Sequence, residues 1–216
     1  MIKAPKTHWE ILSSVQKAIL SHLVFLRECG MYLAGGTALA LQLGHRESLD
    51  YDFFTTQDFN DLEIFERLKK FDPKLTIIQQ ARNTLYVNMR GITVSMFKYI
   101  YPLVQPAVRL EHVDLASLQD IGAMKIQAII DRGTRRDFID FWVLLNELTL
   151  DQMLVAHQNK YGQAHNTYLA LQALMYFSDA EEETSMAQRK ILVPLEWKKV
   201  KSDILKHVFE FRQKKI

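Results

Sequence analysis

The sequence predicts an α/β protein, with a mixed sheet that carries helices and is followed by an α-helical C-terminal region. Three short runs rich in β-branched and aromatic residues, at 75–80, 84–89 and 92–99, are separated by turn residues only and therefore predict antiparallel hairpins. Apolar residues recur with helical spacing in most of the remaining chain. We expect an α/β domain over residues 1–112, with an N-terminal helix, and a helical region over 113–216.

The elements of the first region follow from local signals. The stripe of apolar residues from Trp9 to Leu26 predicts one helix over 7–29, which Gly30 ends. Gly35-Gly36 predicts a tight turn, Thr37 an N-cap, and 38–43 a short helix that Gly44 ends. Aromatic residues predict a strand over 49–54, and a helix follows at 60–70. The sheet would hold four or five strands.

Helical patterns continue through the second region. Ser117 begins an almost wholly apolar helix that extends to residue 130, and Thr134 begins the next, through residue 145. Three more helices are predicted at about 151–161, 165–177 and 195–212. The acidic segment 180–185 is expected to be an exposed link.

Two carboxylates in the first region indicate a metal site. Asp50 and Asp52 stand two residues apart, so on a strand their side chains leave the same face. Like charges this close need a cation between them, and hard oxygen ligands suit Mg²⁺ or Mn²⁺ with phosphates as further ligands. The glycine turn and helix start just upstream favour an anion. Together, the carboxylate pair and the glycine turn predict a site for a metal-bound nucleotide.

The same stretch resembles the nucleotidyltransferase-fold toxins of the AbiEii/AbiGii family, which are relatives of the polymerase-β-like minimal nucleotidyltransferases. The similarity covers roughly residues 31–146. It rests on these residues: Gly35-Gly36-Thr37, His45-Arg46, Ser48, Asp50-x-Asp52-Phe53-Phe54, Lys125 and Arg136-Asp137-Phe138-Ile139-Asp140.

This resemblance implies transfer of a nucleotidyl group from an NTP to an acceptor such as RNA, including tRNA 3′ ends. It also implies a toxin of a toxin–antitoxin or phage-defence pair, with a cognate antitoxin as a possible partner. The expected catalytic residues are Asp50, Asp52, Lys125 and Asp137, with Mg²⁺ or Mn²⁺ on Asp50 and Asp52. The expected nucleotide-binding residues are Gly35, Gly36, Thr37, Arg46, Ser48, Arg136 and Asp140.

One position departs from the fuller superfamily pattern. Many members carry a third carboxylate on a strand after the hairpin, and the corresponding residue here is Ser95. Between Asp72 and Glu111 the chain has no Asp or Glu, so that strand supplies no third acid. Two functions of other kinds therefore remain open: a nucleotide-binding interaction protein without turnover, and an enzyme that nucleotidylates protein.

Several predicted site residues also have structural explanations. Lys125 either meets an anion or lies along the core with its ammonium in water. Asp137 could serve only as the N3 member of a capping pair with Thr134, whereas Asp140 has no such role. Arg46 either neutralises the Asp pair or reaches a phosphate. Arg135 and Arg136 either bind phosphate or are solvated. His45 is expected to be a hydrogen-bonded loop residue.

Composition restricts the setting of the protein. A net charge of +2 neither indicates nor excludes a local basic groove, and the segment 197–215 is locally positive and could follow an RNA backbone, although such faces are usually just solvated. Cys29 is the only cysteine, which excludes a disulfide within the chain. The N-terminus lacks a signal-peptide pattern and no run reaches the ~18 apolar residues of a membrane span, so we expect a soluble cytoplasmic protein.

Overall fold

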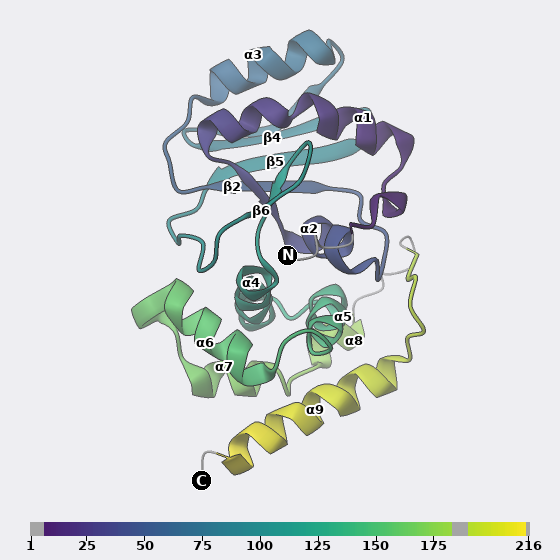
Figure 1. Ribbon diagram of the computed structural model, residues 1–216, viewed down its shortest axis with the longest axis vertical. Helices are drawn as coiled ribbons and strands as arrows, with labels where there is room; N and C mark the ends of the chain where they lie inside the picture. The colour runs from purple at the N-terminus through teal and green to yellow at the C-terminus, as the bar shows by residue number, and fades with distance from the viewer. Residues whose placement is uncertain (1–6, 183–189, 215–216) are drawn as a thin grey trace, which may run out of the picture. The chain divides into compact units, whose positions relative to one another are not determined.

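The computed structural model describes residues 7–182 and 190–214 and consists of two compact units (Figure 1). The first unit is formed by Met1–Pro102 and Pro106–Ala116, and the second by Leu103–Gln105 and Ser117–Ile216. The first unit thus extends past residue 112, because its last strand ends at Leu115. The predicted fold class, a mixed α/β region and a helical region, is confirmed.

A seven-stranded mixed sheet forms the first unit, in the order β3-β4-β5-β2-β1-β7-β6. β3, β4 and β5 form the predicted antiparallel hairpins, β2 pairs parallel with β5, and β1 pairs antiparallel with β2 and parallel with β7. The strands are β1 (Tyr32–Ala34), β2 (Tyr51–Thr55), β3 (Thr76–Ala81), β4 (Thr84–Met89), β5 (Ile92–Lys98), β6 (Val108–Arg109) and β7 (Asp114–Leu115).

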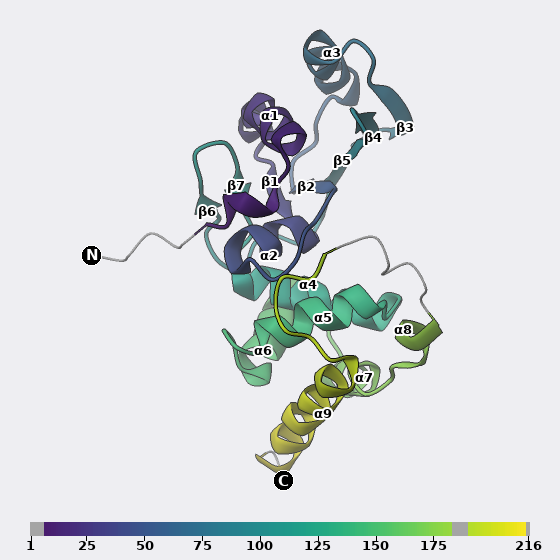
Figure 2. The same cartoon turned by 90° about the vertical axis from the view of Figure 1, so that its right-hand side faces the viewer.

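The helices of this unit are α1 (Ser14–His22), α2 (Gly35–Leu43) and α3 (Asp61–Phe71), and Figure 2 shows α1 and α3 on the same face of the sheet. Burial alternates along β4, where Leu85, Val87 and Met89 are fully buried and the residues between them are half-buried. This alternation gives β4 an aliphatic core face and a second, half-buried face.

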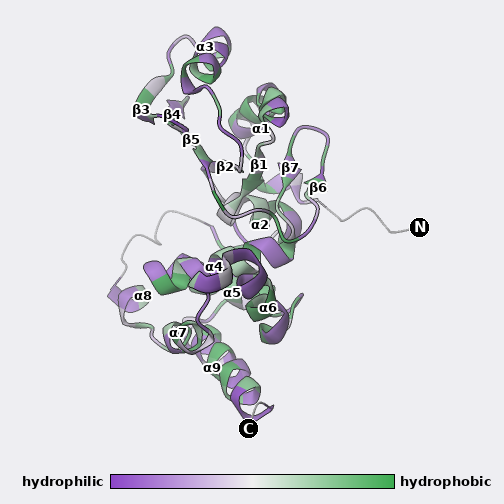
Figure 3. Cartoon of the chain, turned by 90° about the vertical axis from the view of Figure 1, so that its left-hand side faces the viewer, coloured by the Kyte–Doolittle hydropathy of each residue, from purple (hydrophilic) through white to green (hydrophobic). Residues whose placement is uncertain are grey.

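The second unit consists of helices α4 (Leu118–Asp131), α5 (Arg135–Leu144), α6 (Leu150–Tyr161), α7 (Thr167–Ala173), α8 (Ser178–Glu182) and α9 (Trp197–Lys214). The predicted cap of α4 is present, since the Ser117 side chain accepts from the Asp120 amide. Val200, Ile204 and Val208 form the buried stripe of α9, and Figure 3 shows its residues alternating between hydrophobic and hydrophilic. None of the helices in the described ranges combines the length and apolar character that a membrane crossing needs.

Some predicted elements were wrong. The helix expected over 7–29 is divided into 3-10 turns at Trp9–Ile11 and Val24–Cys29 around α1, because Ser13 forms a capping box that starts a new helix. Thr37 is not an N-cap, since α2 already begins at Gly35 after Ala34. Residues 180–182 of the expected acidic link belong to α8 instead, with Ala180 buried, and 183–185 lie outside the described residues.

Candidate active site

Asp52 lies in the middle of the sheet of the first unit. It pairs with Ala34 of β1 on one side and with Ser95 of β5 on the other. The Ser95 hydroxyl lies 2.6 Å from Asp52 Oδ1 and donates to it, and it lies 3.2 Å from the carbonyl of Tyr51. A hydroxyl therefore stands beside Asp52, at the position where the resemblance led us to expect a third acid.

The other Asp52 oxygen lies against the start of α2. Gly35 has a left-handed φ of 66°, and a Cβ on this residue would be 2.9 Å from Asp52 Oδ2. Only glycine combines this backbone angle with such a close approach. The glycine turn and the carboxylate strand, which the sequence suggested would share one ligand, are in direct contact.

Behind this contact, polar side chains fix the chain that leads to Asp50. Thr37 Oγ1 lies 2.7 Å from Ser48 Oγ and also hydrogen-bonds to the carbonyl of Asp50. Both side chains are buried, as is Arg46, whose guanidinium donates to the carbonyl of Glu47 at 3.0 Å. Gly36 makes room for Arg46, because a Cβ there would be 2.0 Å from Arg46 Nη2. The buried hydroxyl of Thr37 thus bonds within the protein.

The donor set around Asp52 suits a small, hard cation. Asp50 and Asp52 are both half-buried, and Asp50 directly precedes β2 rather than belonging to it. Among the described residues no cluster of three or more His, Cys, Asp or Glu side chains could hold a metal ion. Two carboxylates with few other ligands match Mg²⁺, which keeps waters and takes phosphate oxygens as its remaining ligands.

In the second unit, Lys125 joins two buried aspartates. Its ammonium is 3.0 Å from Asp137 Oδ1 and 2.6 Å from Asp140 Oδ2. The exposed side-chain fraction is 8% for Lys125, 1% for Asp137 and 0% for Asp140. The explanation that Lys125 extends to water is therefore excluded, since its ammonium ends between two carboxylates inside the unit.

Asp137 is held by more than its capping position requires. Arg132 donates to both of its oxygens, at 2.9 and 3.1 Å, and the Thr134 hydroxyl donates at 2.6 Å. Thr134 is the N-cap of α5 but makes no side-chain bond to the helix backbone. Burial alone would raise the pKa of Asp137, but the charge of Lys125 and the bonds from Arg132 and Thr134 overcome this effect and hold it well below its usual range. Asp137 therefore remains ionised at neutral pH.

The other basic residues predicted for phosphate contact are less distinctive. The Arg135 guanidinium lies 4.7 Å from the Trp197 ring centroid, a cation–π distance, and Arg136 is half-buried. On α9, Lys199, Lys201 and Lys206 form ion pairs with Asp203, Glu181 and Glu210. Acidic partners thus offset part of the positive charge expected over 197–215, whose last residue lies outside the described ranges.

Sequence reasoning missed two residues. Arg132 is the second cation on Asp137, and its only sequence signal was a basic residue directly before Gly133. Tyr86 lies opposite Ser95 on the face that carries Asp52. Burial and the charge of Asp52 both raise the pKa of Tyr86, so its phenol lies within the field of that carboxylate. Only the cross-strand register, which no local pattern specifies, reveals this residue.

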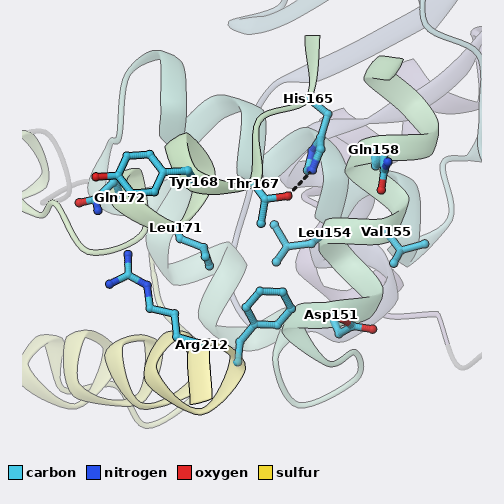
Figure 4. A pocket seen from close by; sticks show the side chains of 11 residues that line it. Asp151, Leu154, Val155, Gln158, His165, Thr167, Tyr168, Leu171, Gln172 and Arg212 are labelled. Atoms are coloured by element: carbon cyan, nitrogen blue, oxygen red, sulfur yellow. Dashed lines mark hydrogen bonds between the residues drawn. The ribbon is translucent and has the colours of Figure 1, made fainter. Parts of the chain in front are cut away.

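A large hollow of the second unit lies away from the Lys125 cluster. About 760 Å³ of open space lies among α6, α7 and α9, around Leu154 and Leu171, with Arg212 on one side and Asp151 on the other (Figure 4). Figure 4 also shows the 2.8 Å bond between His165 and Thr167 at its wall. No predicted site residue lines this hollow, so it does not serve as the candidate active site.

The chain matches the family model described as "Nucleotidyl transferase AbiEii toxin, Type IV TA system" over residues 18–83 and 95–214. It belongs to this family. An uncharacterised protein of Aquifex aeolicus (strain VF5) is 34% identical over 179 residues, which are 80% of this chain and 86% of that protein. Membership of the AbiEii family makes the chain a nucleotidyltransferase and places it among toxins of toxin–antitoxin systems.

Solved structures share the fold at low sequence identity. A candidate nucleotidyltransferase from H. pylori has a TM-score of 0.59 at 17% identity, covering 94% of this chain and 97% of that one. MenT4, a nucleotidyltransferase toxin from Mycobacterium tuberculosis H37Rv, has a TM-score of 0.58 at 15% identity, covering 89% of this chain and 81% of that one. At these identities the likeness shows the nucleotidyltransferase fold alone.

Proposed function

We propose that this AbiEii-family protein transfers a nucleotidyl group from an NTP to a hydroxyl of RNA, in the cytoplasm, as the toxin of a toxin–antitoxin pair. The acceptor hydroxyl loses its proton to water and its oxygen forms a bond to the α-phosphorus, while the bond from the α-phosphorus to the β-phosphate oxygen breaks and releases pyrophosphate. The contact between the Gly35 turn and the Asp52 carboxylate carries the proposal, because it unites an anion-binding helix start with a metal ligand.

Each group then has a defined part. Asp50 and Asp52 would hold Mg²⁺ or Mn²⁺, which when bound neutralises and orients the phosphates. The backbone N–H groups at Gly35 and Gly36 bind phosphate oxygens, and Arg46 and Arg136 add positive charge. Thr37 and Ser48 support this turn from behind, since their hydroxyls contact each other.

Lys125 neutralises charge that develops on the phosphates during transfer. Its ammonium pairs with Asp137 and Asp140. Because Asp137 stays ionised at neutral pH, it cannot donate a proton there, and we assign Asp137 and Asp140 to positioning Lys125.

The test is to incubate the protein with each α-labelled NTP, Mg²⁺ or Mn²⁺, total RNA and a protein extract, beside an Asp52→Ala control. Label on RNA that the control lacks would support the proposal and identify the nucleotide. Label on protein instead would replace the acceptor and establish protein nucleotidylation.

A second function, nucleotide binding without turnover, is favoured by one observation. Ser95 bonds to an oxygen of Asp52 at the position of the third acid. If no nucleotide is transferred to either acceptor while Asp52-dependent NTP binding persists, this binding role replaces the transferase.

A further inference from the structure

A strip of aromatic side chains lies next to Asp52 on the same face of the sheet and continues into the segment that follows β5. Phe54 follows Asp52 by two residues on β2, and Phe97 follows Ser95 by two on β5, so both lie one step further along that face. Phe54 and Phe97 are cross-strand partners. We call the following residues the aromatic strip: Tyr86, Phe97, Phe54, Tyr99 and Tyr101.

The rings of the aromatic strip form an unbroken chain of contacts. Centroid distances are 5.2 Å from Tyr86 to Phe97, 4.7 Å from Phe97 to Phe54, 5.4 Å from Phe54 to Tyr99, and 5.3 Å from Tyr99 to Tyr101. All four contacts are tilted or edge-on, with interplanar angles between 52° and 68°. None of these four contacts covers a ring face with a parallel neighbour, although Phe54 also stacks on Tyr32 of β1, with centroids 6.1 Å apart and an interplanar angle of 26°.

The opposite face of the same strands is sealed. Val87 of β4, together with Val94 and Met96 of β5, is 0% exposed, and the aromatic residues Tyr51 and Phe53 on that face of β2 are 0% and 2% exposed. Every member of the aromatic strip is half-buried, so none of these residues is sealed in the core. Cross-strand aromatic packing stabilises a sheet on its own, but it does not explain why the rings on the face of Asp52 are incompletely buried while Tyr51 and Phe53 on the other face are sealed.

We propose that the aromatic strip stacks the unpaired bases of a single-stranded RNA acceptor whose end lies at Asp52. Neighbouring rings of the aromatic strip have centroids 4.7–5.4 Å apart, so the strip offers successive bases a continuous aromatic surface. Stacking on aromatic side chains holds unpaired bases whatever their sequence, and it contributes about 1–3 kcal/mol per base. The inference rests on the proposed function, because it names the form of the acceptor for that site.

Binding and transfer can be measured separately. Fluorescence anisotropy of a labelled, unstructured RNA octamer, in EDTA and without NTP, reports acceptor binding alone. Phe97→Leu keeps an apolar side chain but removes the ring, so we expect it to weaken octamer binding about tenfold or more. Phe97→Tyr restores the ring and should bind within about twofold of the unchanged protein.

The matched control is Phe65→Leu on α3, which removes another half-buried ring of the same unit. This control should leave octamer binding unchanged, and thermal melting shows that each variant is folded. Equal effects of Phe97→Leu and Phe65→Leu, or no octamer binding by the unchanged protein, would overturn the proposal. If Phe97→Leu weakens NTP binding in Mg²⁺ but not octamer binding, the strip holds the donor base and the acceptor proposal is wrong.

Further arms distinguish this proposal from the proposed function. A matching DNA octamer and a duplex RNA show whether binding needs RNA and unpaired bases; preference for the duplex would contradict base stacking. Asp52→Ala should bind the octamer normally while transferring nothing. If no variant transfers a nucleotide yet Phe97→Leu still weakens octamer binding, the transferase proposal fails and the strip stands as an RNA site.

Discussion

At the residue scale, Gly35 and Gly91 form a matched pair of glycines with left-handed backbone angles. Their φ values are 66° and 85°, but a Cβ on Gly35 would be 2.9 Å from Asp52 Oδ2, whereas a Cβ on Gly91 would meet nothing within 4 Å. Each alanine substitution should cost about 1–2 kcal/mol in unfolding free energy from backbone strain. Only Gly35→Ala should also reduce nucleotidyl transfer, by at least about tenfold, because it displaces the Asp52 carboxylate. Equal transfer rates in the two variants would contradict this assignment.

Lys125 provides a prediction about stability. Replacing it with Met leaves Asp137 and Asp140 buried without the ammonium that joins them. Loss of one partner from a buried ion pair costs about 3–5 kcal/mol, so Lys125→Met should lower the unfolding free energy by that amount in urea denaturation. The control is Lys199→Met, which removes an ion pair from a side chain that is 62% exposed and should change stability by less than about 1 kcal/mol. Similar losses in both would show that the Lys125 cluster is not a buried ionic core.

Asp137 gives the pH dependence of stability. Its folded-state pKa is depressed, so the ionised carboxylate stabilises the fold above the unfolded-state pKa, which is about 3.9. This stabilisation is lost as pH falls below about 4 towards the folded-state pKa. The stability advantage of the unchanged protein over Asp137→Asn, measured by urea denaturation, should therefore be large at pH 7 and shrink towards pH 3. An advantage independent of pH would show that the charge of Asp137 is not what stabilises the fold.

At the element scale, the pairing of β2 with β5 sets the chemistry beside Asp52. Ser95→Asp would place a second carboxylate where a hydroxyl now lies 2.6 Å from Asp52 Oδ1. Without a metal, the two like charges should destabilise the first unit, and Mg²⁺ should then restore about 1–3 kcal/mol of stability. The uncharged control Ser95→Asn should respond to Mg²⁺ no more than the unchanged protein. Thermal melting with and without Mg²⁺ measures the response of each variant. If Ser95→Asp gained no more stability from Mg²⁺ than Ser95→Asn, no metal would bind beside Asp52.

Local patterns predicted some elements and not others, for physical reasons. β4 alternates between buried and half-buried residues, so its period is visible in the sequence. β1 has three buried residues, and β6 and β7 have two residues each, so none of them shows a period. One helix was predicted over 7–29 because apolar residues three apart fit both an α-helix and the two 3-10 segments found there. The lengths of the short strands and their register could not be predicted, because tertiary pairing decides them.

At the scale of the whole molecule, the sequence predicted the chemical groups of the site better than their contacts. Lys125 and Asp140 were recognisable because charged residues in apolar helices need partners. That each is a partner of the other follows only from the packing of α4 against α5. The same holds for the other two residues. Arg132 meets Asp137 through the first turn of the next helix. Tyr86 lies opposite Ser95 through the cross-strand register.

Toxicity in the cell depends on the protein acting as a whole. As a member of a toxin family, the unchanged protein should arrest bacterial growth when its expression is induced without an antitoxin. If arrest results from nucleotidyl transfer, Asp52→Asn should restore growth, because it removes a charge that the proposed phosphate-bound cation would need but keeps the shape of the side chain. Gly91→Ala, which lies in open space, should remain toxic at the same expression level. Arrest that persists with Asp52→Asn at equal expression would show that toxicity does not depend on this site. If instead each variant arrests growth only when it transfers nucleotides, toxicity results from transfer at this site.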